Sequence, residues 1–159
     1  MSNRLVIDLL RVLLVGALLL ILVVQAVYLP LLSGEIARDL PAEAHMRWPI
    51  LTLAILGLLC VQAVIVCTVR LLGFTRADRV FSLDALRWVN GIIGAFIGGS
   101  LVCLTTILYQ NATVAGPPIW SLLLVCGVFA GVGLALLMVV MRTLLVRATT
   151  LKNELDVVI

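Results

Sequence analysis

The sequence predicts an all-α integral membrane protein: a bundle of four transmembrane helices with both termini in the cytoplasm and an amphipathic cytoplasmic tail. The first observation is composition, since 64 % of the 159 residues are hydrophobic and only 12 % are charged, whereas soluble domains are about half apolar and a quarter charged. The second is four apolar stretches, each long enough for the roughly 20 residues that cross a bilayer. The third is the uneven distribution of Lys and Arg around these stretches.

The whole chain, residues 1–159, is treated as a single transmembrane domain. Its four expected spans and its tail cover residues 5–29, 48–72, 86–109, 119–145 and 146–159. Pro30 is expected to close the first span, because proline disfavours a helix interior. Between the first two spans, residues 33–40 and 42–46 are expected to form short helical turns. Pro49 suits the first turn of the second span, where its missing N–H costs little.

The orientation follows from the basic residues, which mark the cytoplasmic side of a membrane protein. With four spans, both termini and the middle loop share one side. That side carries Arg4, Arg11, Arg70, Arg76, Arg79, Arg87, Arg142, Arg147 and Lys152, against Arg38 and Arg47 on the other. We therefore expect a multi-pass protein of the plasma membrane with both termini cytoplasmic. The formal net charge of +3 reflects this asymmetry, and no concentrated basic face indicates direct nucleic-acid binding.

Two cytoplasmic features are candidate partner-binding sites. Arg76, Arg79 and Arg87 could bind anionic lipid headgroups or an acidic protein partner. In the tail, apolar residues recur every three or four positions, which predicts an amphipathic helix that lies on the membrane surface, caps the bundle or binds a partner. This apolar stripe comprises Leu144, Ala148, Leu151, Leu155 and Val158, and Leu151 and Leu155 are the large anchors available for a partner contact.

Two small-residue motifs predict close helix packing. Gly94-x-x-x-Gly98 lies in the third span and Gly127-x-x-x-Gly131 in the fourth. Glycines at this spacing allow two helix backbones to approach closely in lipid. We expect the third and fourth helices to pack against each other through these glycines, with a homo-oligomer as the alternative.

Nothing in the spans predicts an enzyme, a cofactor or a metal site. The intramembrane polar residues do not bring an acid, a base and a nucleophile together. Gln25 and Gln62 are expected to be hydrogen-bond partners between helices. The four cysteines lie in apolar spans without a Cys-x-x-Cys motif, and a disulfide between Cys103 and Cys126 is left open by their comparable depth.

Several short segments resemble a known family. They are Tyr28-Leu-Pro-Leu, Pro41-Ala-Glu43-Ala, Arg47-Trp-Pro49, Arg79-Val-Phe-Ser82, Leu86-Arg87 and the ending Thr149-Thr-Leu-Lys152-Asn-Glu154-Leu-Asp156. Through these segments the chain resembles the bacterial membrane proteins grouped as domain of unknown function family 2975, especially actinobacterial members. It departs from them at Asp39-Leu-Pro41-Ala, where similar proteins often have an aromatic residue and a Pro-Glu pair.

The resemblance implies a four-span protein of a bacterial membrane, with no catalytic residues to carry over. Members are often encoded beside a small helix-turn-helix regulator, which implies a membrane-bound partner that controls it. The leading hypothesis is therefore a non-enzymatic membrane sensor or regulatory anchor for such a regulator. The alternative is a bundle that binds lipid or a small molecule, associated with transport.

Overall fold

The chain is helical throughout the part that the computed structural model describes, residues 2–39, 41–76, 83–113 and 118–158. The helical elements in chain order are α1 (Ser2–Val23), the π-helical turn η1 (Val24–Tyr28), α2 (Leu29–Asp39), the 3-10 helix η2 (Pro41–Met46), α3 (Arg47–Arg76), α4 (Leu83–Thr113) and α5 (Pro118–Val158). No strand occurs among these residues, so the predicted all-α class is confirmed.

Four helical segments of the described chain are long and apolar enough to cross a membrane. They comprise residues Leu5–Asp39, Ala44–Phe74, Asp84–Thr113 and Pro118–Leu155, and each contains one of the predicted spans. The prediction of a four-span membrane protein is thereby confirmed.

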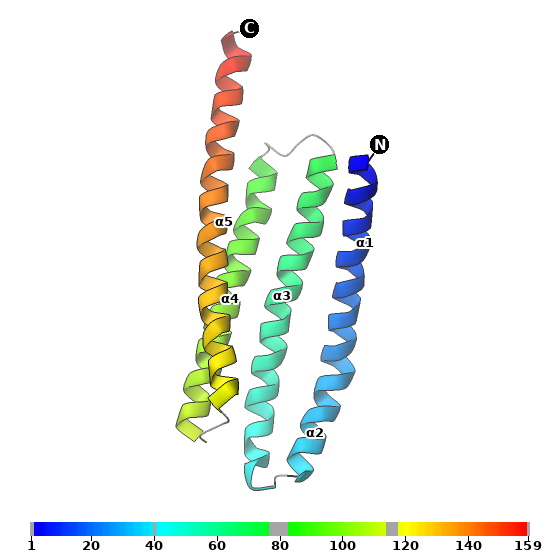
Figure 1. Ribbon diagram of the computed structural model, residues 1–159, viewed down its shortest axis with the longest axis vertical. Helices are drawn as coiled ribbons and strands as arrows, with labels where there is room; N and C mark the ends of the chain where they lie inside the picture. Colours follow the sequence, from blue (N-terminus) through cyan, green and yellow to red (C-terminus); the bar gives the residue numbers. More distant parts are fainter. Residues whose placement is uncertain (1, 40, 77–82, 114–117, 159) are drawn as a thin grey trace.

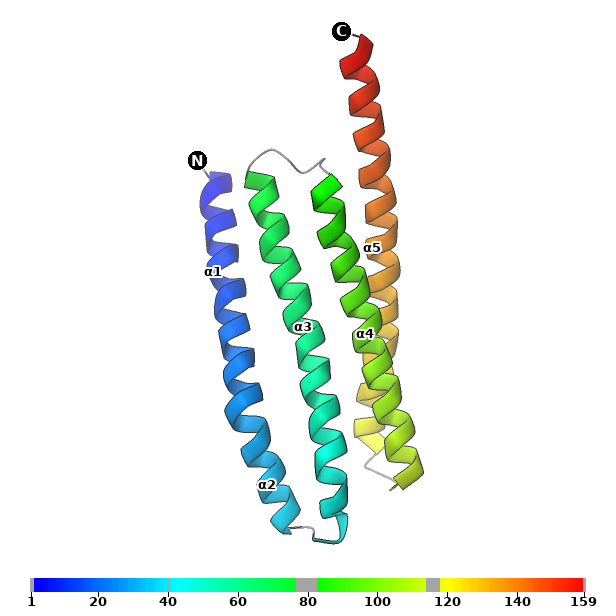
Figure 2. The same cartoon turned by 180° about the vertical axis from the view of Figure 1, so that it is seen from behind.

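The long helices stand side by side in chain order and form an open, curved layer. The substantial contacts are those of α1 with α3, α3 with α4, and α4 with α5, and Figures 1 and 2 show α1 and α5 on opposite sides of the molecule. The accessible surface is 11123 Å², whereas a compact soluble protein of 17.1 kDa would expose about 7,800 Å². The bundle is therefore not closed around one central core.

Both chain termini lie at one end of this layer, called here the termini end (Figure 1). α5 has 41 residues and is about 60 Å long by the rise of an α-helix. α3 and α4 have 30 and 31 residues, so α5 extends well past them at the termini end. At the opposite end lie the turn from α2 to α3, the end of α4 and the beginning of α5.

The prediction that Pro30 closes the first helix was wrong. The helix continues to Asp39, and the π-helical turn η1 ends at Tyr28, two residues before the proline. In this turn the N–H of Leu29 donates to the carbonyl oxygen of Val24, five residues back. A regular α-helical turn would press the Pro30 ring against the carbonyl of Ala26, and the wider π turn relieves that contact. The first helix therefore reaches further toward the opposite end than the sequence indicated.

The corner between α2 and α3 is held by one arginine. Residues 33–39 and 41–46 are helical, as predicted for this connection. Nε of Arg47 donates to the hydroxyl of Ser33 at 3.3 Å, and the guanidinium lies 5.6 Å from the ring centroid of Trp48. Met46 is buried beneath this corner. These contacts fix how the first helix turns back into α3.

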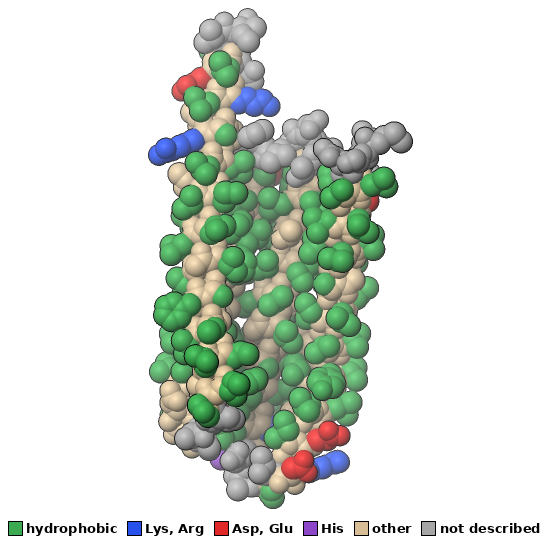
Figure 3. All heavy atoms as spheres, in the orientation of Figure 1, with side chains coloured by type: hydrophobic (Ala, Val, Ile, Leu, Met, Phe, Trp, Pro, Cys, Tyr) green, Lys and Arg blue, Asp and Glu red, His purple; other side chains and the backbone are tan. Residues whose placement is uncertain are grey.

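Hydrophobic side chains cover the middle of the molecule. In Figure 3 charged side chains gather near α2 at the opposite end and on the projecting part of α5. Few described residues are buried, and most leucines and valines of the spans are exposed. Such a surface is unstable in water and suits the hydrocarbon interior of a bilayer.

Candidate functional site

Two features of the termini end are candidates for function: the projecting part of α5 and a groove between α3 and α4. The projecting part, called here the C-terminal extension, comprises residues 146–158 and continues α5 without a break (Figure 1). Leu151 is 60 % exposed and Leu155 is 64 % exposed. The predicted helical tail is thus confirmed, and it projects from the layer instead of lying across it. Its large apolar side chains are uncovered.

The predicted basic cluster is only partly placed. Arg76 is the last residue of α3, Arg79 lies outside the described residues, and Arg87 is exposed in the second turn of α4. Of the three, Arg87 contributes to a defined surface, because it lines the groove.

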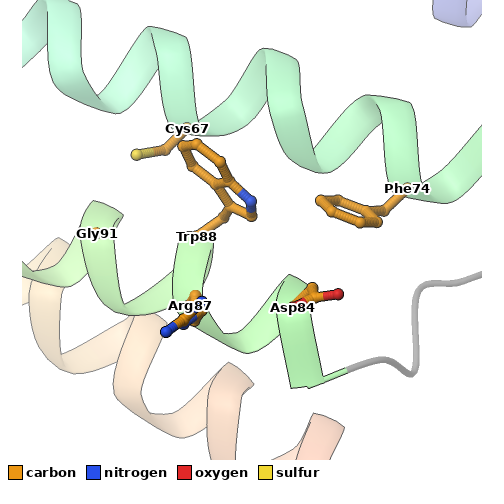
Figure 4. A pocket seen from close by; sticks show the side chains of 6 residues that line it. All are labelled: Cys67, Phe74, Asp84, Arg87, Trp88 and Gly91. Atoms are coloured by element: carbon orange, nitrogen blue, oxygen red, sulfur yellow. The ribbon is translucent and has the colours of Figure 1, made fainter.

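The groove lies between the end of α3 and the beginning of α4 and has a volume of about 370 Å³. Figure 4 shows its six lining residues, Cys67, Phe74, Asp84, Arg87, Trp88 and Gly91. Volumes of this size are typical of sites for small ligands. The lining combines two aromatic rings with one acidic and one basic side chain.

The deep end of the groove is set by a close approach of the two helices. A Cβ placed on Gly91 would lie only 3.0 Å from Sγ of Cys67, so a larger residue there would push α3 and α4 apart. Toward the termini end the space widens, and Phe74 of α3 and Trp88 of α4 flank it (Figure 4). The groove is therefore narrow and apolar at its deep end and open at its mouth.

An arginine of α3 contacts the tryptophan of α4. The guanidinium carbon of Arg70 lies 5.7 Å from the ring centroid of Trp88, a cation–π distance. Asp84 lies in the first turn of α4, where the positive end of the helix dipole favours its carboxylate. Asp84, Arg87 and Arg70 are all exposed, so opposite charges stand together around the groove.

Comparison with protein families identifies the chain. The family model described as Protein of unknown function (DUF2975) matches residues 31–159, which is more than half of the chain. The chain belongs to this family. The matched residues include those that line the groove and those of the C-terminal extension. No curated protein and no solved structure matches the chain.

The glycines of the two small-residue motifs do not share one interface in this DUF2975 protein. Gly127 and Gly131 face α4: a Cβ at Gly127 would lie 3.3 Å from Sγ of Cys103, and one at Gly131 would overlap the hydroxyl of Ser100. Gly98 instead faces α3, 3.4 Å from Sγ of Cys60, and no atom lies within 4 Å of a Cβ at Gly94. The spacing of the motif was visible in the sequence, but the face of the helix was not.

The two span glutamines meet between α1 and α3. Nε2 of Gln62 donates to Oε1 of Gln25 at 2.9 Å, and Nε2 of Gln25 donates to the carbonyl oxygen of Ile55 at 3.4 Å. The expected hydrogen bond between helices is confirmed. Gln25 lies within the π-helical turn η1, so the irregular turn also directs this side chain.

The four cysteines are free in the structure, so Cys103 and Cys126 are not bridged there. Sulfur atoms of Cys60, Cys67 and Cys103 lie against glycines of neighbouring helices, where they act as small apolar side chains. Among the described residues no group of three His, Cys, Asp or Glu side chains could hold a metal ion.

Sequence reasoning missed Phe74, Trp88 and Arg70 as parts of a site. A signal was available, because Trp88 and Arg70 both lie near the predicted cytoplasmic ends of spans, where aromatic and basic side chains gather. The sequence did not show that Arg70 and Trp88 contact each other across the interface of α3 and α4.

Proposed function

We propose that this protein is a non-enzymatic regulatory anchor of the bacterial plasma membrane, which holds a small cytoplasmic helix-turn-helix transcription regulator on the C-terminal extension of α5. The observation that carries the proposal is the projection of α5 past the other helices with Leu151 and Leu155 uncovered. The nature of the partner comes from the family resemblance.

The length of α5 supports a contact in water. A helix crosses the roughly 30 Å of hydrocarbon with about 20 residues, and α5 has 41. The extension adds about 20 Å, so an upright α5 carries Leu151 and Leu155 beyond the hydrocarbon. Covering each leucine by a partner is worth roughly 1.5 to 3 kcal/mol. A docked protein therefore gains binding free energy by burying the two leucines that the projecting helix leaves exposed.

The charges beside the apolar stripe favour a partner with a different sequence. The spacing of Leu144, Ala148, Leu151 and Leu155 alternates between four and three residues, as in the seam of a coiled coil. In a parallel coiled coil of two copies, Arg147 would stand opposite the Lys152 of the other copy. Because like charges at these flanking positions disfavour pairing, the stripe suits a partner helix with acidic flanking residues.

The orientation is part of the proposal. The termini end carries the basic residues that mark the cytoplasmic side. Reporter proteins fused after Ile159, or inserted within residues 73–87, are expected to be cytoplasmic, whereas a tag within residues 33–47 is expected to be labelled from outside. Labelling of the C-terminus from outside intact cells would contradict the proposal.

Co-purification tests the docking role. The double variant Leu151→Ser with Leu155→Ser removes both anchors and leaves the spans unchanged. The expected result is normal membrane expression and loss of a co-purifying small helix-turn-helix regulator. The matched control is Asn153→Ser with Val157→Ser on the opposite face of the same helix, which should retain the partner. If wild-type membranes capture no such protein, the anchor role is refuted.

A second candidate function is a membrane bundle that binds lipid or a small molecule and is associated with transport. The observation that favours it is the groove between α3 and α4, with its aromatic rings and its charged mouth. The anchor remains the first proposal because a helix of 41 residues exceeds what binding within the membrane requires.

A further inference from the structure

We propose that the groove between α3 and α4 binds a zwitterionic phospholipid whose headgroup carries a primary ammonium, of the phosphatidylethanolamine type. This inference rests on the second candidate function and names its ligand class. It is drawn from the depth, the charges and the aromatic walls of the groove.

The groove lies at the depth where phospholipid headgroups meet their acyl chains. Phe74 lies in the last turn of α3 and Asp84 in the first turn of α4, at the ends of two helices that are long and apolar enough to span a membrane, and both residues line the groove. Cys67 and Gly91 lie about two turns deeper along their helices, within the apolar spans. A ligand that fills the groove must therefore be apolar at its deep end and polar at its mouth, as a phospholipid is.

The side chains that line the mouth include one acid, Asp84, and one base, Arg87. Asp84 and Arg87 are three residues apart on α4, and both line the groove. The Arg87 guanidinium can donate to phosphate oxygens, and an ammonium group can donate to the Asp84 carboxylate. Phosphate and ammonium are joined by two carbons in an ethanolamine headgroup, so one molecule can satisfy both side chains.

The same pair of charges disfavours an anionic lipid. A headgroup that carries only a phosphate would place its charge near the Asp84 carboxylate as well as near Arg87. The Arg70 guanidinium lies over the Trp88 ring and is not among the lining residues of the groove. A quaternary ammonium has no N–H to donate, so a choline headgroup would leave Asp84 without a hydrogen bond.

The aromatic walls suit the glycerol and upper acyl region. Phe74 and Trp88 stand on opposite sides of the groove, and Figure 4 shows the indole nitrogen of Trp88 on the side that faces Phe74 and Asp84. An indole N–H is a donor only, and at this depth the ester and phosphate oxygens of a lipid are its natural acceptors. The rings would thus contact the chain while the indole binds an oxygen.

Quenching of Trp88 fluorescence by lipids with brominated acyl chains tests the inference. The protein has three tryptophans, so Trp48→Phe with Trp120→Phe leaves Trp88 as the reporter in the full-length chain. The probes are brominated phosphatidylethanolamine, phosphatidylglycerol and phosphatidylcholine in detergent micelles. We expect half-maximal quenching by the ethanolamine lipid at about a two- to fivefold lower mole fraction than by the other two lipids. This ratio corresponds to the binding free energy of one partly exposed ion pair.

Two variants locate the headgroup contact. Asp84→Asn should abolish the preference for the ethanolamine lipid over phosphatidylglycerol, with Trp88 still quenched. The matched control, Asp39→Asn, changes an exposed acid at the opposite end and should keep the preference. Persistence of the preference in Asp84→Asn, with a thermal stability equal to the parent, would overturn the inference.

The remaining outcomes distinguish this inference from the second candidate function on which it rests. Equal quenching by the three lipids would refute headgroup selection and leave a lipid-binding groove. Trp48→Phe with Trp88→Phe leaves the exposed Trp120 as the reporter. Quenching of Trp88 no stronger than that of Trp120 would refute headgroup selection and the lipid-binding groove together. Soluble phosphoethanolamine should not displace the brominated lipid at equal concentration, because it lacks the acyl chains. Displacement would assign the groove to a free phosphate compound instead.

Discussion

The interfaces of α4 with α5 and of α1 with α3 are built in different ways. Between α4 and α5, Gly127 and Gly131 bring the backbones so close that a Cβ at Gly131 would lie 3.2 Å from the carbonyl oxygen of Phe96. Between α1 and α3, the contact is less extensive and its polar link is the pair Gln25 and Gln62. Since lipid supplies no hydrophobic force between helices, close packing and polar bonds are the available forces.

The difference divides the layer into a firmly packed part and a more weakly attached helix. Helices α3, α4 and α5 are joined by small residues and carry both candidate sites, the groove and the C-terminal extension. α1 contributes to neither. Substitutions at the close contacts should therefore cost more than the loss of the glutamine pair, and substitutions in the extension should cost least.

The largest effect is expected for Gly131→Leu. Its Cβ would overlap the Ser100 hydroxyl, and the larger side chain would force α5 away from α4, at a cost of about 1–3 kcal/mol or more. Thermal unfolding in detergent measures the loss. The matched control is Gly133→Leu, two residues along the same helix, where no atom lies within 4 Å of the Cβ. Equal destabilisation by both variants would show that α5 packs through another face.

A smaller but distinct effect is expected for Gly98→Leu at the contact of α4 with α3. Its Cβ would lie 3.4 Å from Sγ of Cys60, so an alanine would fit and a leucine would not. Gly94→Leu, on the uncovered side of α4, serves as its control and should retain the parent yield of folded protein. A lower yield for Gly94→Leu than for Gly98→Leu would contradict the observed orientation of α4, in which Gly98 faces α3 and Gly94 does not.

The glutamine pair should give a modest effect that depends on both partners. Gln62→Leu leaves Gln25 without its donor, and the expected cost is about 0.6–2 kcal/mol. Adding Gln25→Leu should cost little more, because the bond is already lost. A double-mutant cycle on thermal stability measures this coupling. Additive effects would mean that the two side chains act independently.

The smallest effect on stability is expected from Leu151→Ser with Leu155→Ser. Both leucines are exposed beyond the packed helices, so the melting temperature of the purified bundle should stay close to that of the wild type, as for surface substitutions in general. A clear drop in melting temperature would mean that the extension folds back against the bundle, and it would weaken the docking proposal.

The spans were predictable from the sequence because hydrocarbon demands long apolar helices with internally satisfied backbones. The heptad-like stripe after Leu144 likewise predicted that the last helix continues. Pro30 misled the prediction, since a π-helical turn can carry a helix past a proline. The sequence did contain the residues of the groove, but scattered over the ends of two spans.

The sequence by itself determined the four spans, their uneven basic flanks and the apolar stripe of the tail, because these depend on composition and periodicity along one segment. Only the tertiary structure decided that the helices form an open layer, that Gly98 and Gly131 face different neighbours, and that Phe74, Asp84 and Trp88 enclose one groove. The physical reason is the orientation of each helix about its own axis. An apolar helix in lipid is hydrophobic on every side, so its hydrophobic pattern does not reveal which face meets a neighbouring helix.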